Sequence, residues 1–206
     1  MNKRNFQKEL DILIENLGDT KPELLLHSCC APCSSYVLEY LNKYFNITVL
    51  YYNPNIYPEE EYFHRKEEQK RFISEKKWEN PIKFMDCDFE SEIFYNSVKG
   101  LESEKEGGKR CEVCFNLRLD KTAELAKKNG FEYFCTTLSI SPLKNAEVLN
   151  KIGEELSEKH GIKYLPSDFK KKNGYKRSIE LSKEFSLYRQ DYCGCVYSRE
   201  NSQIAR

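Results

Sequence analysis

The sequence predicts an α/β fold built on a doubly wound, mainly parallel sheet. Short apolar runs alternate with longer amphipathic segments along most of the 206 residues, which is the pattern of strands joined by crossover helices. A cysteine group, Cys29-Cys30-Ala31-Pro32-Cys33, directly follows the first apolar run. Ligands of such sheets bind beyond the carboxyl ends of the strands, so this group falls where the fold places its site.

The elements are assigned in chain order. Residues 3–17 are predicted to form an amphipathic helix, with Phe6, Leu10 and Leu13 on one face and Gly18 as its end. Short apolar runs predict strands at residues 23–28, 47–52, 82–85, 133–136 and 163–165. Helical periodicity predicts the remaining helices at residues 34–44, 58–78, 111–129, 145–160 and 175–186, with Gly130 closing the third of these.

Length and charge set further limits. We expect a single α/β domain over residues 1–206, with a helical extension at 1–20 ahead of a core at 21–206. Lys and Arg number 33, as do Asp and Glu, so bulk charge neither favours nor excludes nucleic acid. The N-terminal segment is charged throughout and lacks the apolar run of a signal peptide or membrane span. We therefore expect a cytoplasmic protein with no membrane partner.

Nine cysteines in a cytoplasmic chain call for an explanation, because structural disulfides are rare in that compartment. Cysteines at short spacings there more often bind metal or carry out redox chemistry. Seven of the nine fall into three groups: Cys29, Cys30 and Cys33; Cys111 and Cys114; Cys193 and Cys195. Seven sulfurs exceed one tetrahedral zinc site, but suffice for a four-cysteine iron–sulfur cluster plus a three-cysteine metal site.

Other interpretations of these cysteines stay open at this point. One alternative is a zinc site that pins loops, in a zinc-stabilised RNA-binding or RNA-modifying module without redox chemistry. A dithiol enzyme would use Cys30 and Cys33 alone. Cys87 and Cys135 stand apart and are expected to be buried apolar residues. Gly107-Gly108-Lys109 lacks P-loop spacing and no GxGxxG follows the first strand, so no nucleoside triphosphate is expected.

Several motifs follow one another in order between about residue 24 and residue 198. They are His27-Ser28-Cys29-Cys30-Ala31-Pro32-Cys33, Tyr52-Asn53-Pro54-Asn55-Ile56, Glu61-Tyr62 with Arg65, Lys109-Arg110-Cys111…Cys114, Thr136-Thr137-Leu138…Ser141-Pro142…Lys144-Asn145, and Tyr188-Arg189-Gln190…Tyr192-Cys193-Gly194-Cys195. Together they resemble the cobalamin-independent epoxyqueuosine reductases. The resemblance implies two-electron reduction of epoxyqueuosine at the wobble position of tRNA, with the epoxide oxygen lost as water, as the last step of queuosine biosynthesis.

The resemblance also implies a nucleotide-binding-like (HUP) fold, similar to the PP-loop ATPases that thiolate tRNA, with the cysteine group in place of their pyrophosphate loop. It implies a [4Fe-4S] cluster beside a mononuclear iron, for which another divalent metal is an alternative. By this analogy the cluster is held by Cys33, Cys111, Cys114 and one of the last two cysteines, assigned as Cys193. The lone metal is then held by Cys29, Cys30 and Cys195.

The implied reaction needs protons, electrons and an RNA surface. Four residues within or beside the motifs are candidates to deliver a proton: Tyr52, Tyr192, Asp191 and His27. An external one-electron donor protein is implied. Candidate RNA contacts are Arg110 and Arg189 beside the cysteine groups, and Lys171, Lys172 and Arg177 in the densest basic stretch. Phe169 and Tyr175, interleaved with that stretch, are candidates to stack on bases.

Overall fold

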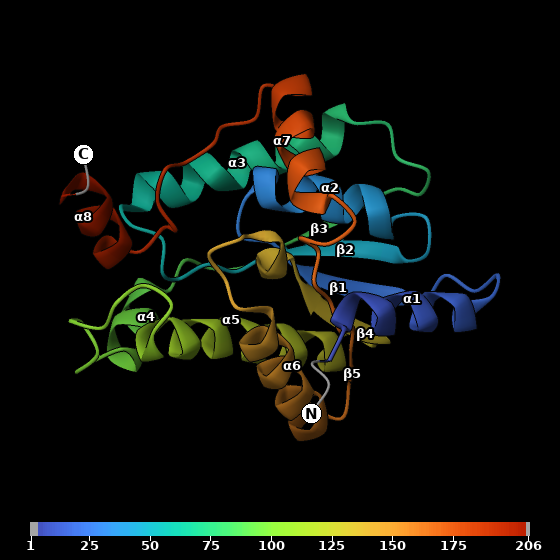
Figure 1. Cartoon of the computed structure of the whole chain (residues 1–206), viewed down its shortest axis with the longest axis horizontal. Coiled ribbons are helices and arrows are strands. Elements are labelled where there is room, and N and C mark those ends of the chain that lie inside the picture. Colours follow the sequence, from blue (N-terminus) through green and yellow to red (C-terminus); the bar gives the residue numbers. More distant parts are fainter. Residues whose placement is uncertain (1–3, 205–206) are drawn as a thin grey trace.

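A computed structural model describes the backbone of residues 4–204 and the side chains of residues 4–200. Its centre is a five-stranded, all-parallel sheet in the order β3-β2-β1-β4-β5 (Figure 1). The strands are β1 (Glu23–His27), β2 (Asn46–Tyr51), β3 (Lys83–Asp86), β4 (Tyr133–Thr136) and β5 (Lys163–Tyr164). The α/β fold with a doubly wound parallel sheet is thereby confirmed.

Helices cover both faces of the sheet. They are α1 (Phe6–Leu17), α2 (Ala31–Leu41), α3 (Glu59–Glu75), α4 (Ser91–Ser97), α5 (Lys109–Lys128), α6 (Ala146–His160), α7 (Gly174–Glu184) and α8 (Val196–Ile204), with a 3-10 turn, η1, at Thr137–Ile140. One core layer packs apolar residues of α1, α2 and α3 against the sheet, and a second packs those of α5 and α6. Figure 1 shows α2, α3 and α7 on one side of the sheet and α5 and α6 on the other.

The strand order reverses at the centre of the sheet. β1 pairs with β2 on one side and with β4 on the other, so the crossovers leave in opposite directions from this point. The side chains that follow these two strands meet there: the Cys29 Sγ lies 3.9 Å from the Thr137 Oγ1. This is the crevice where open α/β sheets bind ligands.

The element boundaries differ from the sequence prediction in ways that matter for the site. α2 begins at Ala31, three residues early, because Pro32 in the first turn is compatible with a helix start. α5 begins at Lys109, two residues before the predicted start, and includes both Cys111 and Cys114, as the prediction did. Two short helices, α4 and α8, were not predicted, and they lie on the same side of the molecule (Figure 1).

The N-terminal helix belongs to the packed structure. Leu10 is buried in the core beside α2, and Arg4 bridges Glu9 and Glu154 at 2.6 and 2.7 Å. The carboxylate of Asp11 pairs with Lys172 ahead of α7 at 2.7 Å. Within residues 4–204, no helix has both the length and the apolar character that crossing a membrane requires.

Candidate metal centre and adjoining cavity

The first cysteine group forms a compact triad at the end of β1. Cys30 is extended and stands immediately before the first residue of α2, and Cys33 lies in the first turn of that helix. The three Sγ atoms of Cys29, Cys30 and Cys33 all lie within 4.8 Å of one another. A metal that binds thiolates at about 2.3 Å holds any two of them at most about 4.6 Å apart, so the triad comes close to the spacing around one ion.

The thiols of the triad differ in their pKa values. Hydrogen bonds from Cys29 and Cys33, the positive charge of Arg65 and the amide of Gln190 hold the pKa of Cys30 well below its ordinary value. The Gln190 Nε2 lies 3.1 Å from the Cys30 Sγ. Hydrogen bonds with Cys29 and Cys30, together with burial, raise the pKa of Cys33 instead, and the negative charge of its neighbours adds to this. The group therefore supplies a thiolate readily, and the thiolate is the form that binds metal.

The other two groups meet at a second place. Cys111 and Cys114 lie three residues apart on the first turns of α5, which puts both on one face. Together with Cys193 and Cys195 they line a cavity of about 20 Å³. The structure therefore brings all seven cysteines to one end of the sheet, but places Cys33 with the triad and Cys195 with this quartet, unlike the division drawn from resemblance.

The two remaining cysteines lie outside both sets. Cys135 is buried in β4, where its thiol donates to the Leu165 carbonyl at 3.3 Å and burial raises its pKa to about 12. Cys87 is half-buried just beyond β3, where burial raises its pKa to about 11. Neither lines the cavity that the other four cysteines share, nor the larger one beside the triad.

The bend between Cys193 and Cys195 depends on glycine. Gly194 has φ of 134°, a backbone conformation that favours glycine. A β-carbon there would lie 3.2 Å from both the Arg65 Nη1 and the Ile56 Cγ1, and the Gly194 carbonyl accepts a hydrogen bond from the Tyr57 amide at 2.8 Å. The bend is therefore held from both sides.

We expect Gly194→Ala to weaken metal binding at the quartet, because the added carbon meets Arg65 and Ile56 and the backbone is strained. Iron per chain and the number of alkylatable thiols measure this. Gly100→Ala is the matched control: Gly100 has φ of 83° but open space around it, so this variant carries backbone strain without the contacts. Equal iron retention in the two variants would contradict the expectation.

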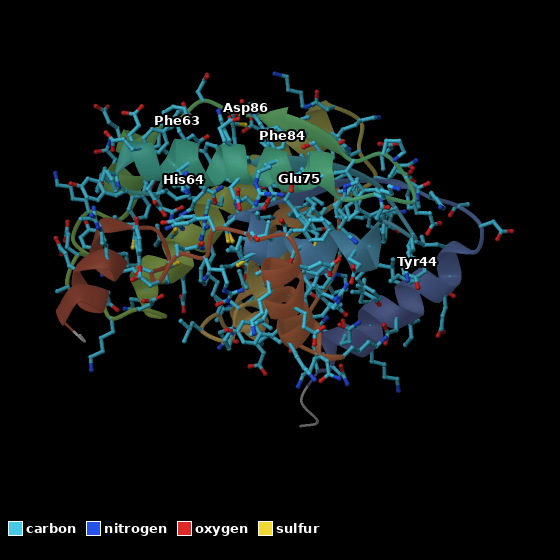
Figure 2. The ribbon with its side chains drawn as sticks, turned by 90° about the horizontal axis from the view of Figure 1, so that it is seen from above. Tyr44, Phe63, His64, Glu75, Phe84 and Asp86 are labelled. Atoms are coloured by element: carbon cyan, nitrogen blue, oxygen red, sulfur yellow. The ribbon has the colours of Figure 1, made fainter. Side chains whose placement is uncertain are left out.

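The segment that carries Cys193 and Cys195 is fastened to α3. The Tyr188 amide donates to Glu68 at 2.7 Å and the Tyr188 hydroxyl to Glu61 at 3.1 Å. The Tyr188 ring also contacts His64 edge-on, with centroids 4.3 Å apart. Figure 2 shows His64 and Glu75 along α3, with Phe84 and Asp86 of β3 on its far side. One helix thus spans from the sheet edge to the last cysteine group.

We expect Glu68→Gln to loosen this segment, because a neutral amide holds the Tyr188 amide and Arg71 less strongly than a carboxylate does. Hydrogen exchange over residues 186–195 measures the effect, and Glu67→Gln, at an exposed neighbouring carboxylate, is the control. Arg71 lowers the pKa of Glu68, so the carboxylate stabilises the fold above its unfolded pKa and loses this contribution as pH falls through its folded pKa. If hydrogen-exchange protection over residues 186–195 changed neither with Glu68→Gln nor with falling pH, this expectation would be contradicted.

Three arginines lie buried around the cysteines. Arg65, Arg110 and Arg118 are 1%, 2% and 2% exposed, and each has a terminal guanidinium nitrogen, Nη2, without a hydrogen-bond partner. Arg118 lines the small cavity and also a larger neighbouring cavity that is lined by Cys29, Cys33 and Cys193. Burial acts to lower its pKa, but the thiols of Cys114, Cys193, Cys29 and Cys111 outweigh burial and raise it. Unpaired cationic donors facing thiols fit an anionic metal–sulfur group, so the residues present suit such a centre.

A larger cavity of about 340 Å³ adjoins the cysteines. Cys29, Cys33 and Cys193 line one part of it, and Lys144 and Arg118 bring positive charge. Burial acts to lower the pKa of Lys144, but the thiols of Cys193, Cys29 and Cys33 outweigh it and raise the pKa above its ordinary value. The volume lies in the range of small-molecule sites.

Two of the four candidate proton donors line this cavity, and the other two do not. Asp191 and Tyr192 line it, and the Tyr192 hydroxyl donates to the Tyr57 carbonyl at 2.7 Å. Tyr52 and His27 do not line it. Tyr52 is 2% exposed, and burial raises its pKa to about 12.

His27 is fully buried and has both ring nitrogens occupied. Its Nε2 lies 3.1 Å from the Tyr52 carbonyl, which can only accept, so Nε2 carries the proton. Its Nδ1 accepts from the Thr136 hydroxyl at 2.9 Å. Burial and the charge of Arg118 lower its pKa to about 3, so the ring is neutral near neutral pH. His27 therefore joins the ends of β1, β2 and β4.

The structure alters part of the expected RNA surface. Arg110 is buried, its Nη1 donates to the Leu101 and Glu102 carbonyls, and it stacks on Tyr197, so it does not present a charge to RNA. Phe169 is completely buried in the core, so stacking of this ring on bases is ruled out.

The other candidates lie at the surface. Arg177 pairs with Glu39 at 2.8 Å, and Lys172 pairs with Asp11. Lys171 is exposed, and Arg189 is exposed and lines the large cavity. Tyr175, 37% exposed, and Leu143, 73% exposed, also line it. Sequence reasoning missed Lys144, Arg118 and Leu143 as cavity residues, although Lys144 stands within one of the motifs quoted above.

Fold and site together define a doubly wound α/β protein with a cysteine-rich candidate metal centre at the switch point of its sheet. A family profile described as "Epoxyqueuosine reductase QueH" matches residues 24–201. The chain belongs to this family. It is 49% identical to the Epoxyqueuosine reductase QueH of Streptococcus pyogenes serotype M1 over 186 residues, covering 89% of this chain and 73% of the relative.

Two further relatives carry the same name. The protein of Staphylococcus aureus (strain Mu50) is 43% identical over 202 residues, covering 95% of this chain and 84% of the relative. That of Thermotoga maritima is 37% identical over 179 residues, covering 85% of this chain and 89% of the relative. The profile match starts after α1, at the first residues of β1.

Proposed function

We propose that this protein reduces epoxyqueuosine in tRNA to queuosine, the final step of queuosine biosynthesis. The observation that carries the proposal is the convergence of seven cysteines beside a cavity of about 340 Å³, in a chain of the epoxyqueuosine reductase family. The reaction adds two electrons and two protons, breaks both carbon–oxygen bonds of the epoxide, forms a carbon–carbon double bond and releases water.

The cysteines are proposed to hold a [4Fe-4S] cluster and a neighbouring iron ion. Cys111, Cys114 and Cys193 belong to the cluster, and Cys29 and Cys30 to the ion. Cys33 and Cys195 complete the two sets, one in each, and their positions favour Cys33 on the ion and Cys195 on the cluster. When bound, these groups supply electrons one at a time and a Lewis-acidic metal, with an external one-electron donor protein as the source.

The chain itself supplies charge and protons in the cavity. Lys144 is proposed to stabilise the negative charge that develops on the departing oxygen and to deliver a proton to it, because its side chain lines the cavity with Cys29, Cys33 and Cys193. Tyr192 and Asp191 line the same cavity and remain candidates for the second proton. His27 and Tyr52 are assigned instead to shaping the loops that follow β1 and β2.

The tRNA is proposed to approach at the rim that Leu143 and Tyr175 form. Both side chains are exposed although apolar or aromatic, and both line the cavity, so a nucleobase turned out of the anticodon loop meets them first. Arg189 lies at the same cavity and Lys171 near the start of α7, where both are available to phosphates.

The test is a turnover assay with anaerobically prepared protein, a chemical one-electron reductant and tRNA that carries epoxyqueuosine. Nucleosides from the digested tRNA are analysed by mass spectrometry. The proposal predicts conversion to a nucleoside that is lighter by one oxygen atom, dependent on iron. Binding of the tRNA without any such conversion by iron-loaded protein would overturn it and favour a zinc-stabilised RNA-binding module.

A further inference from the structure

Three arginines are buried beside the cysteine groups. Arg65, Arg110 and Arg118 are the three largest fully buried side chains among the described residues. Arginine is almost never buried to this degree unless it is paired. Among the described residues, one carboxylate pairs with a member of this set: the Glu61 carboxylate lies 2.6 Å from the Arg65 Nε. No ion pair with a described carboxylate is found for Arg110 or Arg118.

Neutral oxygen atoms accept hydrogen bonds from only some of the N–H groups of Arg110 and Arg118. Arg118 donates from Nε to the Cys114 carbonyl at 3.2 Å and from Nη1 to the Asn53 amide oxygen at 3.5 Å. The Arg118 Nη2 and the Arg110 Nε and Nη2 have no partner. Carbonyl and amide groups satisfy hydrogen bonds but do not neutralise charge, and an uncompensated buried ion strongly destabilises a fold.

The cysteines lie beside all three guanidinium groups, and Glu106 lines the same two cavities as Arg118. Arg110 and Arg118 line the small cavity with Cys111, Cys114, Cys193 and Cys195. Arg65 approaches from α3, where its Nη1 donates to the Cys193 carbonyl at 3.3 Å and lies against Gly194. Arg118 also lines the large cavity beside Cys29 and Cys33, so it stands between the two cysteine sets.

We propose that Arg118, with Arg65 and Arg110, is the built-in countercharge of an anionic metal–sulfur centre, and that Arg118 raises the reduction potential of that centre. This inference rests on the proposed function, because it requires that the cysteines hold such a centre. A reduced centre carries one more negative charge than an oxidised one, so a fixed positive charge beside it favours reduction. Arg118 acts through the centre and is a positioning residue.

The proposal predicts that Arg118 destabilises the protein when no metal is bound. Without the metal–sulfur group, Arg118 has no ion pair with a described carboxylate, and its Nη2 lacks a hydrogen-bond partner. Replacing Arg118 by an uncharged side chain of similar length should therefore stabilise the metal-free protein and harm the loaded one. A purely structural arginine, held for its packing and its hydrogen bonds to Cys114 and Asn53, would give the opposite sign in the metal-free protein.

The experiment compares the full chain with Arg118→Met and Arg118→Lys, metal-free and after reconstitution with iron and sulfide. Thermal unfolding of the metal-free forms and anaerobic redox titration of the loaded forms are the two measurements. We expect Arg118→Met to raise the unfolding midpoint of metal-free protein by several degrees and to lower the reduction potential. Arg118→Lys should keep the potential near that of the unaltered protein.

The control is Arg4→Met, which removes a guanidinium already paired with Glu9 and Glu154 at the surface. It should leave the potential unchanged and should not stabilise the metal-free protein. Arg118→Met with a lower metal-free midpoint, with an unchanged potential, or unable to fold would overturn the inference while the proposed function stands. Unaltered protein that takes up no iron or sulfide would overturn both.

Discussion

Cys193→Ala is expected to remove both the visible absorption of the metal centre and the reduction of epoxyqueuosine in tRNA. Cys193 lines the small cavity with the other three cysteines of the quartet and lines the large cavity beside Cys29 and Cys33. With the cluster proposed above, loss of one of its four thiolates would break the site, and without its electrons the epoxide would not be reduced. Absorbance and iron per chain, together with single-turnover conversion, measure the two losses, and activity should fall to background.

Cys87→Ala is the matched control for this variant. Cys87 is half-buried just beyond β3, away from both cysteine sets, so its replacement should leave colour and conversion intact. Cys111→Ala should behave as Cys193→Ala does, because Cys111 lies in the same quartet. Colour lost in the Cys87 variant and kept in the other two would contradict the ligand assignment.

Lys144→Met is expected to slow conversion by about 10²-fold, the size of effect typical for removal of a general acid, while iron and sulfide content stay unchanged. Lys144 is the cation of the large cavity whose side chain ends in a transferable proton, and three thiols raise its pKa so that it stays charged. Methionine keeps most of the side-chain volume and removes the charge. A single-turnover rate under excess reductant isolates the step.

Lys151→Met provides the control on the following helix, since Lys151 is 77% exposed at its side chain and pairs with Glu155. Its rate should equal that of the unaltered protein. A Lys144→Met protein that reduces epoxyqueuosine at the normal rate would show that the proton comes from elsewhere. Loss of iron in that variant would instead assign Lys144 to holding the centre.

The sheet could be predicted from sequence because each strand is a short apolar run between polar breaks. The helices α4 and α8 could not, because few of their residues are apolar and only Phe94 of α4 is fully buried. Pro32 reads as an interruption in sequence, yet it stands in the first turn of α2, where proline is favourable. That shift places Cys33 inside the helix start.

The cysteine groups could be identified from their spacing, but their partners could not. A single lysine or arginine carries no sequence signal that distinguishes a solvated side chain from a buried one. Arg118 stands on a charged amphipathic helix and Arg110 beside a cysteine, yet both are 2% exposed. Phe169 failed as a base-stacking candidate for the same reason, since an aromatic residue next to lysines is as compatible with a core position as with a surface one.

Metal analysis of anaerobically purified protein tests the central claim most directly. Iron, acid-labile sulfide and zinc are measured alongside the visible spectrum of the full chain. The account predicts a brown protein with roughly four to five irons per chain and sulfide to match a four-iron cluster. A colourless protein with stoichiometric zinc and no sulfide, even after reconstitution with iron and sulfide, would contradict it.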